Sequence, residues 1–445
     1  MRSSAAIALF VLIASSPARV VAMSVSIAPA ASMTDAAVAV RISAPPGDTV
    51  DVALAAQKYG LTFRSSATYR APAAGVIDLA KQAPLRGSYA GVDPMGLFWT
   101  VVPDRTAPKP FEFGRDTDLL AVPFTITAVD RSKTATASGS RVSLSSTVER
   151  RVVDRGRFVA TLFAPKRGGC ERGVVILGGS EGGVPEQLAA VVAAHGFTTL
   201  ALGYFGAPGL PQTLTDIPIE TVQRAVTFMH ARREVCTSRS IAILGGSKGA
   251  ELALLAASTF SGIGPVVATA PSSIVFSGIG ENRSDPDPSS WSYGGKPLPF
   301  ANGKVPPAVS AALDAQMKAG QKPSFLDSYL AQLDGNTQAK APIAVERIDA
   351  PVMVVAGGSD RLWPSAHMAR LVADRLKAHA HPYADAVDIY PRAGHPIGLP
   401  FQFAIAELAH AGIALGGTPT SNERAAEAAW PLMIHFLQTR PVPGT

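Results

Sequence analysis

Two patterns of apolar and polar residues divide the chain near residue 150. Residues 24–150 show no helical periodicity and contain short β-prone runs, such as Thr49–Leu54 and Leu97–Val102, between turns rich in Pro, Gly and Asp. Short strands separated by frequent turn residues are typical of an all-β sandwich. We therefore predict a β-sandwich domain over residues 24–150.

From residue 157 to 440, apolar runs alternate with segments in which apolar residues recur at helical spacing. Such alternation, with β-branched strands, is typical of a parallel sheet covered by helices on both faces. The runs that we predict as strands are Val174–Leu177, Thr198–Leu202, Ile241–Leu244, Pro265–Thr269, Val352–Ala356 and Val387–Tyr390. The segments that we predict as helices include Pro185–Ala194, Pro218–Arg232 and Ser365–Ala378.

Residues 275–345 interrupt this alternation. They are rich in Pro, Gly, Ser and Asn, with one helical stretch near Ala308–Lys318. We interpret them as an insertion above the sheet and expect it to form part of a substrate pocket.

The most informative segment is a predicted strand, turn and helix over residues 240–258. The strand ends in Gly245-Gly246-Ser247-Lys248-Gly249, and a run rich in Ala and Leu follows. This is the context of a G-x-S-x-G nucleophile elbow, in which the flanking glycines let the strand and the helix approach closely. We predict Ser247 as a catalytic nucleophile.

A second match to the same motif, Gly178-Gly179-Ser180-Glu181-Gly182, follows an earlier predicted strand. Further glycine and proline residues come directly after it, so a helix cannot begin at once, and Ser180 is not favoured as the nucleophile. A glycine-rich turn at this place suits a supply of backbone N–H donors to an oxyanion. We expect the oxyanion hole to use the N–H of Lys248 and one from this turn, at Ser180 or Glu181.

Asp360 and His395 each follow a later predicted strand, in the order Ser, Asp, His that an α/β-hydrolase requires. Because a free serine hydroxyl is a weak nucleophile, His395 is needed to take its proton, and Asp360 to fix the imidazole tautomer. The alternative for Asp360 is a cap on the helix that begins near Pro364. The sequence thus predicts the triad Ser247, Asp360 and His395 in an α/β-hydrolase domain.

Other candidate residues carry weaker signals. Tyr204, after a predicted strand, either lines the pocket or packs against its neighbours, and we interpret Trp363 as a packing residue. No histidine has the spacing of a metal ligand and there is no cysteine cluster, so we expect neither a metal nor another cofactor. The histidines without predicted catalytic partners are His195, His230, His367, His379, His381, His410 and His435.

The composition and charge of the chain indicate which classes of binding partner to expect. The chain is 47% hydrophobic and 17% charged, as in a globular protein, and its net charge of +6 is spread without a Lys/Arg block. A nucleic-acid partner is therefore not expected, because binding of that kind needs a basic patch. The two cysteines, Cys170 and Cys236, each precede a core strand, and the sequence leaves open whether they form a disulfide or two free thiols.

Residues 1–22 have the features of a secretory signal peptide. Arg2 is followed by an apolar core, Ala5–Ala14, which is much shorter than a membrane span of about 20 residues. Small-residue cleavage sites follow at Ser16-Pro17-Ala18 and Val20-Val21-Ala22. We expect export to the periplasm or the medium without a membrane span in the mature protein; the alternative is an uncleaved anchor.

The motifs together resemble those of the bile acid-CoA:amino acid N-acyltransferase / acyl-CoA thioesterase family. The matching segments are Gly87–Trp99, Gly246–Leu252, Ala344–Ile348, Asp360 with Trp363–Ser365, and Tyr390–Pro391 with Gly394–His395. The resemblance implies an N-terminal Ig-like β-sandwich and a C-terminal α/β-hydrolase with a Ser or Cys, Asp, His triad. The amino-acid-conjugating member of the family has Cys as its nucleophile, and the thioesterases have Ser, as at position 247 here.

We therefore expect a serine hydrolase that cleaves small-molecule thioesters or esters of apolar acyl chains through an acyl-serine intermediate. The alternatives are an exported carboxylesterase or peptidase, an acyl-CoA:amino acid N-acyltransferase, and an inactive binding module. The export signal leaves open whether the leaving group is CoA, and neither acyl length nor oligomeric state follows from the sequence.

Overall fold

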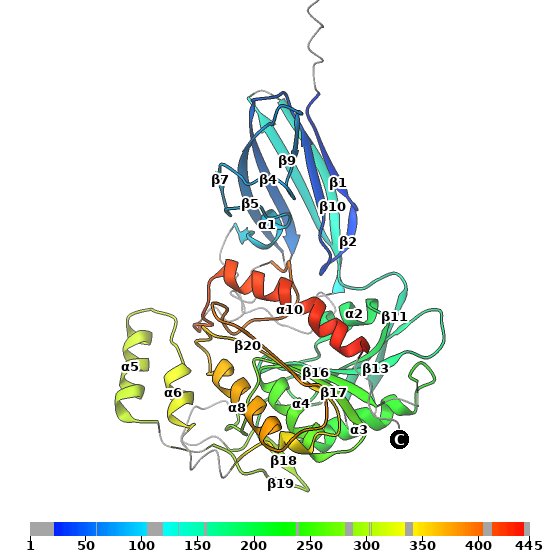
Figure 1. Cartoon of the computed structure of the whole chain (residues 1–445), viewed down its shortest axis with the longest axis vertical. Coiled ribbons are helices and arrows are strands. Elements are labelled where there is room, and N and C mark those ends of the chain that lie inside the picture. Colours follow the sequence, from blue (N-terminus) through cyan, green and yellow to red (C-terminus); the bar gives the residue numbers. More distant parts are fainter. Residues whose placement is uncertain are drawn as a thin grey trace, which may run out of the picture.

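A β-rich domain stands on an α/β domain (Figure 1). The computed structural model describes residues 22–439 except 59, 105–118, 132, 155–157, 237–239, 281–287, 302, 304, 334–340 and 404–411. The signal-peptide features of residues 1–21 lie outside the described residues. In the part of the chain that is described, no helix is both long and apolar enough to cross a membrane.

The N-terminal domain is a sandwich of two sheets. One sheet has the order β1-β3-β6, and the other has the order β2-β10-β9-β4-β5-β7, with β8 paired to β5. Along β4, buried residues such as Val50, Val52 and Leu54 alternate with exposed ones, as expected for a strand with one face on the core. The strands are β1 (Ser24–Ala28), β2 (Ala31–Met33), β3 (Ala39–Ser43), β4 (Thr49–Lys58), β5 (Leu61–Arg70), β6 (Val76–Asp78), β7 (Arg86–Gly87), β8 (Val102–Pro103), β9 (Val122–Asp130) and β10 (Lys133–Val142).

The predicted β-prone run Leu97–Val102 is wrong as a strand. Its first residues form the short helix α1 (Gly96–Trp99), and only Val102 begins a strand. The buried carboxylate of Asp93 accepts hydrogen bonds from the Met95 N–H at 2.9 Å and from the Trp99 indole N–H at 3.0 Å. These two bonds hold the chain in a turn, and an apolar run this short does not distinguish a buried strand from a buried helix.

The α/β domain is built on an eight-stranded sheet with the order β11-β12-β14-β13-β16-β17-β20-β21. The strands from β14 to β21 are parallel, and β12 pairs antiparallel with both β11 and β14. All six predicted strands are present; β11 and β12, which precede them, were not predicted. The strands are β11 (Val148–Asp154), β12 (Val159–Pro165), β13 (Arg172–Leu177), β14 (Phe197–Gly203), β16 (Ile241–Gly246), β17 (Ile263–Thr269), β20 (Val352–Gly357) and β21 (Ala386–Tyr390).

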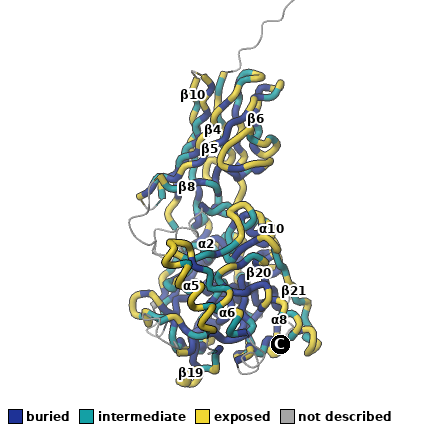
Figure 2. The backbone as a smooth tube through the Cα atoms, turned by 90° about the vertical axis from the view of Figure 1, so that its left-hand side faces the viewer, coloured by how far each residue is buried: buried dark blue, intermediate teal, exposed yellow. Residues whose placement is uncertain are grey.

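Helices cover both faces of this sheet, and the sheet is the most deeply buried part of the domain (Figure 2). Val174 and Ile176 share a core with α2 (Glu186–Ala194) and α10 (Pro419–Thr439). Val175 and Leu177, which point to the other face, share a core with three further helices. Burial on both faces explains why the strands are continuous apolar runs. The three further helices are α3 (Glu220–His230), α4 (Lys248–Thr259) and α8 (Ser365–Ala378).

The insertion at 275–345 packs on the side of α4 and α8. Its strand β18 (Trp291–Tyr293) pairs with β15 (Ile217–Pro218) and with β19 (Lys296–Pro297), and its two helices are α5 (Pro307–Lys318) and α6 (Leu326–Ala331). It ends in a 3-10 turn at Val345–Arg347.

Candidate active site

Ser247 lies at the sharp turn between β16 and α4 and has a backbone φ of 54° and ψ of −121°. This conformation is strained for a residue with a side chain, and it presents the hydroxyl at the end of the strand. The turn requires glycine on both sides: a Cβ at Gly245 would lie 2.2 Å from the Gly249 carbonyl oxygen, and one at Gly249 would lie 2.2 Å from the Gly178 carbonyl oxygen. The two glycines of the predicted elbow are thus a steric necessity.

His395 and Asp360 complete a hydrogen-bonded relay from Ser247. The Nε2 atom of His395 lies 3.0 Å from Ser247 Oγ, and its Nδ1 atom lies 2.8 Å from Asp360 Oδ2. The imidazole is 9% exposed and the carboxylate 2% exposed. Because Asp360 accepts the Nδ1–H, Nε2 is left to accept the serine proton. The structure therefore brings together the three residues predicted as a triad.

The loop that carries Asp360 shows that this residue is not a helix cap. Asp360 Oδ1 accepts the backbone N–H groups of Leu362 and Trp363, and Oδ2 accepts the Ser365 hydroxyl at 2.7 Å. Helix α8 begins at Ser365, and its N-cap position, Pro364, has no side-chain cap. These three donors fix the orientation of the carboxylate toward His395.

The glycine-rich turn after β13 lies beside the nucleophile, as expected for an oxyanion hole. A Cβ at Gly179 would lie 3.2 Å from the Cβ of Ser247. Within the described chain, the backbone N–H groups of Ser180, Glu181 and Lys248 donate to no protein acceptor. They remain donors for a substrate oxygen, in the arrangement that oxyanion stabilisation needs. The Glu181 side chain serves the turn itself, because its Oε1 atom accepts the Gly179 N–H at 2.7 Å.

The Tyr204 side chain is hydrogen-bonded to the backbone of this turn. Its hydroxyl donates to the carbonyl oxygens of Gly178 at 2.5 Å and Gly179 at 3.3 Å. The side chain is buried, and burial raises the pKa of Tyr204 well above its usual value, so the hydroxyl stays protonated as a donor. Tyr204 is thus neither a pocket residue nor simply a packing residue. The Gly179 carbonyl shares its peptide with the Ser180 N–H, so Tyr204 helps to orient this candidate oxyanion donor; the Gly178 carbonyl shares its peptide with the Gly179 N–H, which donates to Glu181.

We expect Tyr204→Phe to lower kcat about 10-fold while KM changes little. The change removes only the hydroxyl, so the peptide that carries the Ser180 N–H loses a support while the apolar acyl contacts remain. Steady-state kinetics measures the split, and thermal unfolding serves as the control. A parallel rise in KM, or a loss explained by unfolding, would show that Tyr204 acts only on stability.

The Lys248 side chain, unlike its N–H, points away from the substrate into a buried network. Its ammonium lies 3.2 Å from Glu251 Oε2 and 2.8 Å from Ser290 Oγ. Glu251 Oε1 also accepts the Trp291 indole N–H at 2.7 Å. Each buried charge is therefore paired and hydrogen-bonded, which offsets the cost of burying it. The network joins the first turn of α4 to the insertion, a role that sequence reasoning missed.

A cavity of about 430 Å³ opens at Ser247 and His395. Contrary to prediction, none of its lining residues, as far as the chain is described, comes from the insertion at 275–345. Its walls come instead from the oxyanion turn, the His395 loop, the β-sandwich and α10. The residues that these last two contribute are Lys58, Trp99, Pro419, Asn422, Glu423, Ala426, Trp430 and Met433.

This cavity is mainly apolar and suits an acyl chain. Its one buried carboxyl on α10, Glu423, accepts the Phe401 N–H at 2.6 Å. Burial raises the pKa of Glu423 to about 8, so the group is largely uncharged at neutral pH. Among the described residues, no cluster of three His, Cys, Asp or Glu side chains could hold a metal ion.

The β-sandwich is held against the active site by the segment Gly87–Trp99. Asp93, which is 1% exposed, accepts a bond from the Arg424 guanidinium of α10 at 3.1 Å as well as the Trp99 indole N–H. Trp99 in turn lines the cavity. Phe63 stacks on Phe403 at 5.5 Å between ring centroids. The motif thus shapes the substrate cavity from outside the α/β domain.

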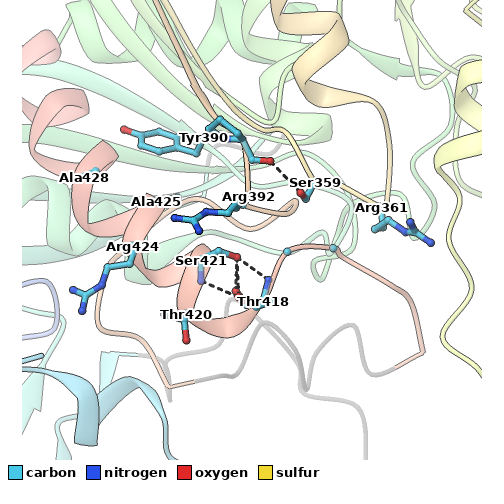
Figure 3. Close-up of a pocket in the computed structure, with 14 residues that line it drawn as sticks. Ser359, Arg361, Tyr390, Arg392, Thr418, Thr420, Ser421, Arg424, Ala425 and Ala428 are labelled. Carbon is cyan, nitrogen blue, oxygen red and sulfur yellow. Dashed lines mark hydrogen bonds between the residues drawn. The ribbon is translucent and has the colours of Figure 1, made fainter. Parts of the chain in front are cut away.

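A second cavity, of about 880 Å³, lies between the first turns of α10 and the loops after β20 and β21 (Figure 3). Three arginines, Arg361, Arg392 and Arg424, contribute to its lining. Sequence reasoning did not find it, because its residues come from three separate segments.

The chain is similar in sequence to known acyl-CoA thioester hydrolases. Residues 35–156 match the model of the acyl-CoA thioester hydrolase/BAAT N-terminal region, and residues 217–441 match that of the BAAT / acyl-CoA thioester hydrolase C terminal. Acyl-coenzyme A thioesterase 1 of Rattus norvegicus is 31% identical over 87% of this chain and 89% of its own. The peroxisomal succinyl-coenzyme A thioesterase of Mus musculus is 28% identical over 90% of this chain and 92% of its own. A dienelactone hydrolase structure from Klebsiella pneumoniae covers 66% of this chain and 99% of its own, at a TM-score of 0.39 and 14% identity.

Proposed function

The chain belongs to the BAAT/acyl-CoA thioester hydrolase family, and we propose that it hydrolyses acyl-CoA thioesters through an acyl-serine intermediate on Ser247. The observation that carries the proposal is the pair of hydrogen bonds made by His395, 3.0 Å to Ser247 Oγ and 2.8 Å to Asp360 Oδ2, at the mouth of an apolar cavity. The relay supplies a nucleophile, and the cavity supplies room for an acyl chain.

The geometry supports two half-reactions. In the first, Ser247 Oγ attacks the thioester carbon while His395 Nε2 takes the hydroxyl proton, and the oxygen that becomes negative meets the N–H groups of the oxyanion turn. The C–S bond then breaks, and the imidazolium protonates the leaving thiolate. In the second, His395 takes a proton from water, the hydroxide attacks the acyl-serine ester, and collapse returns the proton to Ser247.

Serine at position 247 favours hydrolysis over transfer to an amine. The acyl-enzyme is an oxygen ester, which is less reactive toward amines than the thioester that a cysteine would form. Water, at high concentration, should therefore capture the acyl group. We expect free acid as the main product from an acyl-CoA in the presence of glycine or taurine, and only minor conjugate.

Product analysis by mass spectrometry with added glycine tests this expectation. The matched variant Ser247→Cys should shift the ratio toward N-acylglycine if the nucleophile sets the outcome. Mainly N-acylglycine from the wild-type protein would identify an N-acyltransferase and overturn the hydrolase proposal. Turnover of simple esters without any turnover of thioesters would favour a carboxylesterase instead.

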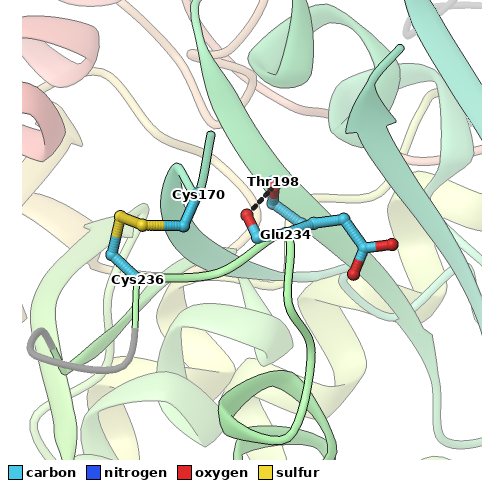
Figure 4. The surroundings of a disulfide bond; sticks show 4 residues. All are labelled: Cys170, Thr198, Glu234 and Cys236. Carbon is cyan, nitrogen blue, oxygen red and sulfur yellow. Dashed lines mark hydrogen bonds between the residues drawn. A yellow bond between two sulfur atoms is a disulfide. The ribbon is translucent and has the colours of Figure 1, made fainter. Parts of the chain in front are cut away.

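We also propose that the protein is exported, on the signal-peptide features of residues 1–22. A disulfide supports this proposal: Cys170 and Cys236, left open by the sequence, are bonded, with Cα atoms 4.8 Å apart (Figure 4). They precede the neighbouring parallel strands β13 and β16. Disulfides persist in oxidising compartments and are rare in a reducing cytosol.

A further inference from the structure

The second cavity lies directly behind the loops that carry the catalytic acid and base. Its lining includes Ser359, which precedes Asp360, and Ala393, which is two residues before His395. Gly416, also in the lining, pairs with Asp360 in an isolated bridge. Because each residue spans at most about 3.6 Å, Ala393 and His395 lie within about 7 Å of each other along the chain. The cavity therefore lies close to the reacting groups.

The cavity has a strongly basic lining. Arg361 lies at one end, and Arg392 and Arg424 lie toward the other (Figure 3). None of the 14 lining residues is acidic. Arg424 is held by Glu427 and Asp93, whereas Arg361 and Arg392 have no acidic partner in the part of the chain that is described.

The start of helix α10 adds polar neutral residues to the same wall. Thr418, Thr420 and Ser421 line the cavity around the first turn of α10. Thr418 and Ser421 bond to each other within this turn, so of the three hydroxyls only that of Thr420 has no partner in the described chain. This hydroxyl and the positive end of the α10 dipole complement the arginines in favouring an anion. Guanidinium groups match phosphate in particular, because they can donate two parallel hydrogen bonds.

We propose that this cavity binds the phosphate-bearing nucleotide half of the acyl-CoA substrate. The inference rests on the proposed function and names the subsite for the leaving group. A volume of about 880 Å³ accommodates a nucleotide, and basic groups at both ends suit a molecule that carries phosphate at more than one position. The export signal left open whether the leaving group is CoA. A phosphate-binding subsite favours CoA, because a leaving group without phosphate would not use it.

The two cavities lie on either side of residues 421–424 of α10, a segment that we call the ridge. The acyl chain would lie on one side of this ridge and the nucleotide on the other. Asn422 stands in this ridge: its Oδ1 atom accepts the Gly394 N–H at 2.7 Å, and its amide donates to the Gly416 carbonyl at 3.3 Å. Asn422 and Glu423 line the acyl cavity, whereas Ser421 and Arg424 line the basic one. The long pantetheine arm of CoA crosses from the nucleotide to the thioester at Ser247.

The test compares two thioesters of the same acyl chain, one with CoA and one with N-acetylcysteamine, which lacks the nucleotide. We expect Arg361→Gln combined with Arg392→Gln to raise KM for acyl-CoA about 10- to 100-fold, because each lost charged contact costs roughly 10-fold. The kcat/KM for the N-acetylcysteamine thioester should not change. Arg233→Gln, at a 92% exposed arginine after α3 on the other face of the sheet, removes the same charge as a matched control.

Several outcomes would overturn the inference. Equal losses with both thioesters would mean that the arginines act on the fold, and unchanged KM for acyl-CoA would mean that the cavity does not bind the nucleotide. If inorganic pyrophosphate altered N-acetylcysteamine thioester turnover while CoA gave no advantage, the site would serve a free phosphate effector. These failures differ from that of the proposed function, in which the wild-type protein would hydrolyse neither thioester.

Discussion

Ser247→Ala should lower kcat by on the order of 10⁴-fold or more, because the residues of a triad act as a unit and loss of the nucleophile removes the covalent route. Some activity above the uncatalysed rate should remain, since the oxyanion donors and the binding cavity are intact. The fold should not change, because in the described chain the Ser247 hydroxyl makes a hydrogen bond only with His395. Turnover of an acyl-CoA measures the effect.

The chain supplies its own matched control in Ser180, the serine of the second G-x-S-x-G match. Ser180→Ala keeps the backbone N–H that we assign to the oxyanion hole and removes only the hydroxyl. We expect its activity to stay within a few fold of wild type. Wild-type activity in Ser247→Ala, or a collapse in Ser180→Ala, would show that the wrong elbow has been assigned.

Asp360→Asn should lower kcat about 10⁴-fold while the protein still folds. The amide nitrogen would donate toward His395 Nδ1, which favours the tautomer that carries its proton on Nε2 and cannot accept the serine proton. The carboxylate lies 2.8 Å from Nδ1 and also accepts the Ser365 hydroxyl, so the geometry stays nearly the same in the variant. Steady-state kinetics, with thermal unfolding as the control, measures the change.

A neighbouring contact separates this effect from a general disturbance of the loop. Ser365→Ala removes one bond to Asp360 Oδ2 but leaves the carboxylate charge and the His395 contact. We expect it to cost much less activity than Asp360→Asn. If Asp360→Asn stayed within a few fold of wild type, another carboxylate would have to orient the imidazole.

The triad could be predicted from sequence because its constraints are local. The glycines at 245 and 249 are required by contacts within 2.2 Å, so the elbow leaves a readable motif. Asp360 and His395 follow apolar strands in the order that the sheet demands, and the carboxyl ends of parallel strands lie at one edge. The order of the strands is therefore enough to predict that the three residues meet.

The substrate cavity could not be predicted, because it depends on contacts between distant segments. Its walls combine Trp99 of the β-sandwich with Trp430 and Met433 of α10, and no single stretch of sequence signals that they meet. The helix itself had a signal, since buried residues recur at helical spacing at Ala426, Trp430 and Met433. The insertion was assigned to the pocket from composition alone, which does not reveal the side of the sheet on which a segment packs.

The support of the oxyanion turn was also beyond sequence reasoning. Tyr204 reaches back from the next strand in the chain to the carbonyls of Gly178 and Gly179, and this pairing depends on the register of β13 and β14. A tyrosine after a strand gives no hint of its hydrogen-bond partner. Hydrogen bonds of this kind, between a side chain and a distant catalytic loop, can be identified only from the structure.

Labelling with a fluorophosphonate, followed by mapping of the modified peptide by mass spectrometry, shows directly whether Ser247 is the acyl-accepting nucleophile of a thioester hydrolase. An acyl-CoA substrate present during labelling should slow the reaction. We expect a single adduct on Ser247, which is lost in Ser247→Ala and forms more slowly in Asp360→Asn. An adduct on Ser180, or no adduct on a protein that still hydrolyses acyl-CoA, would contradict it.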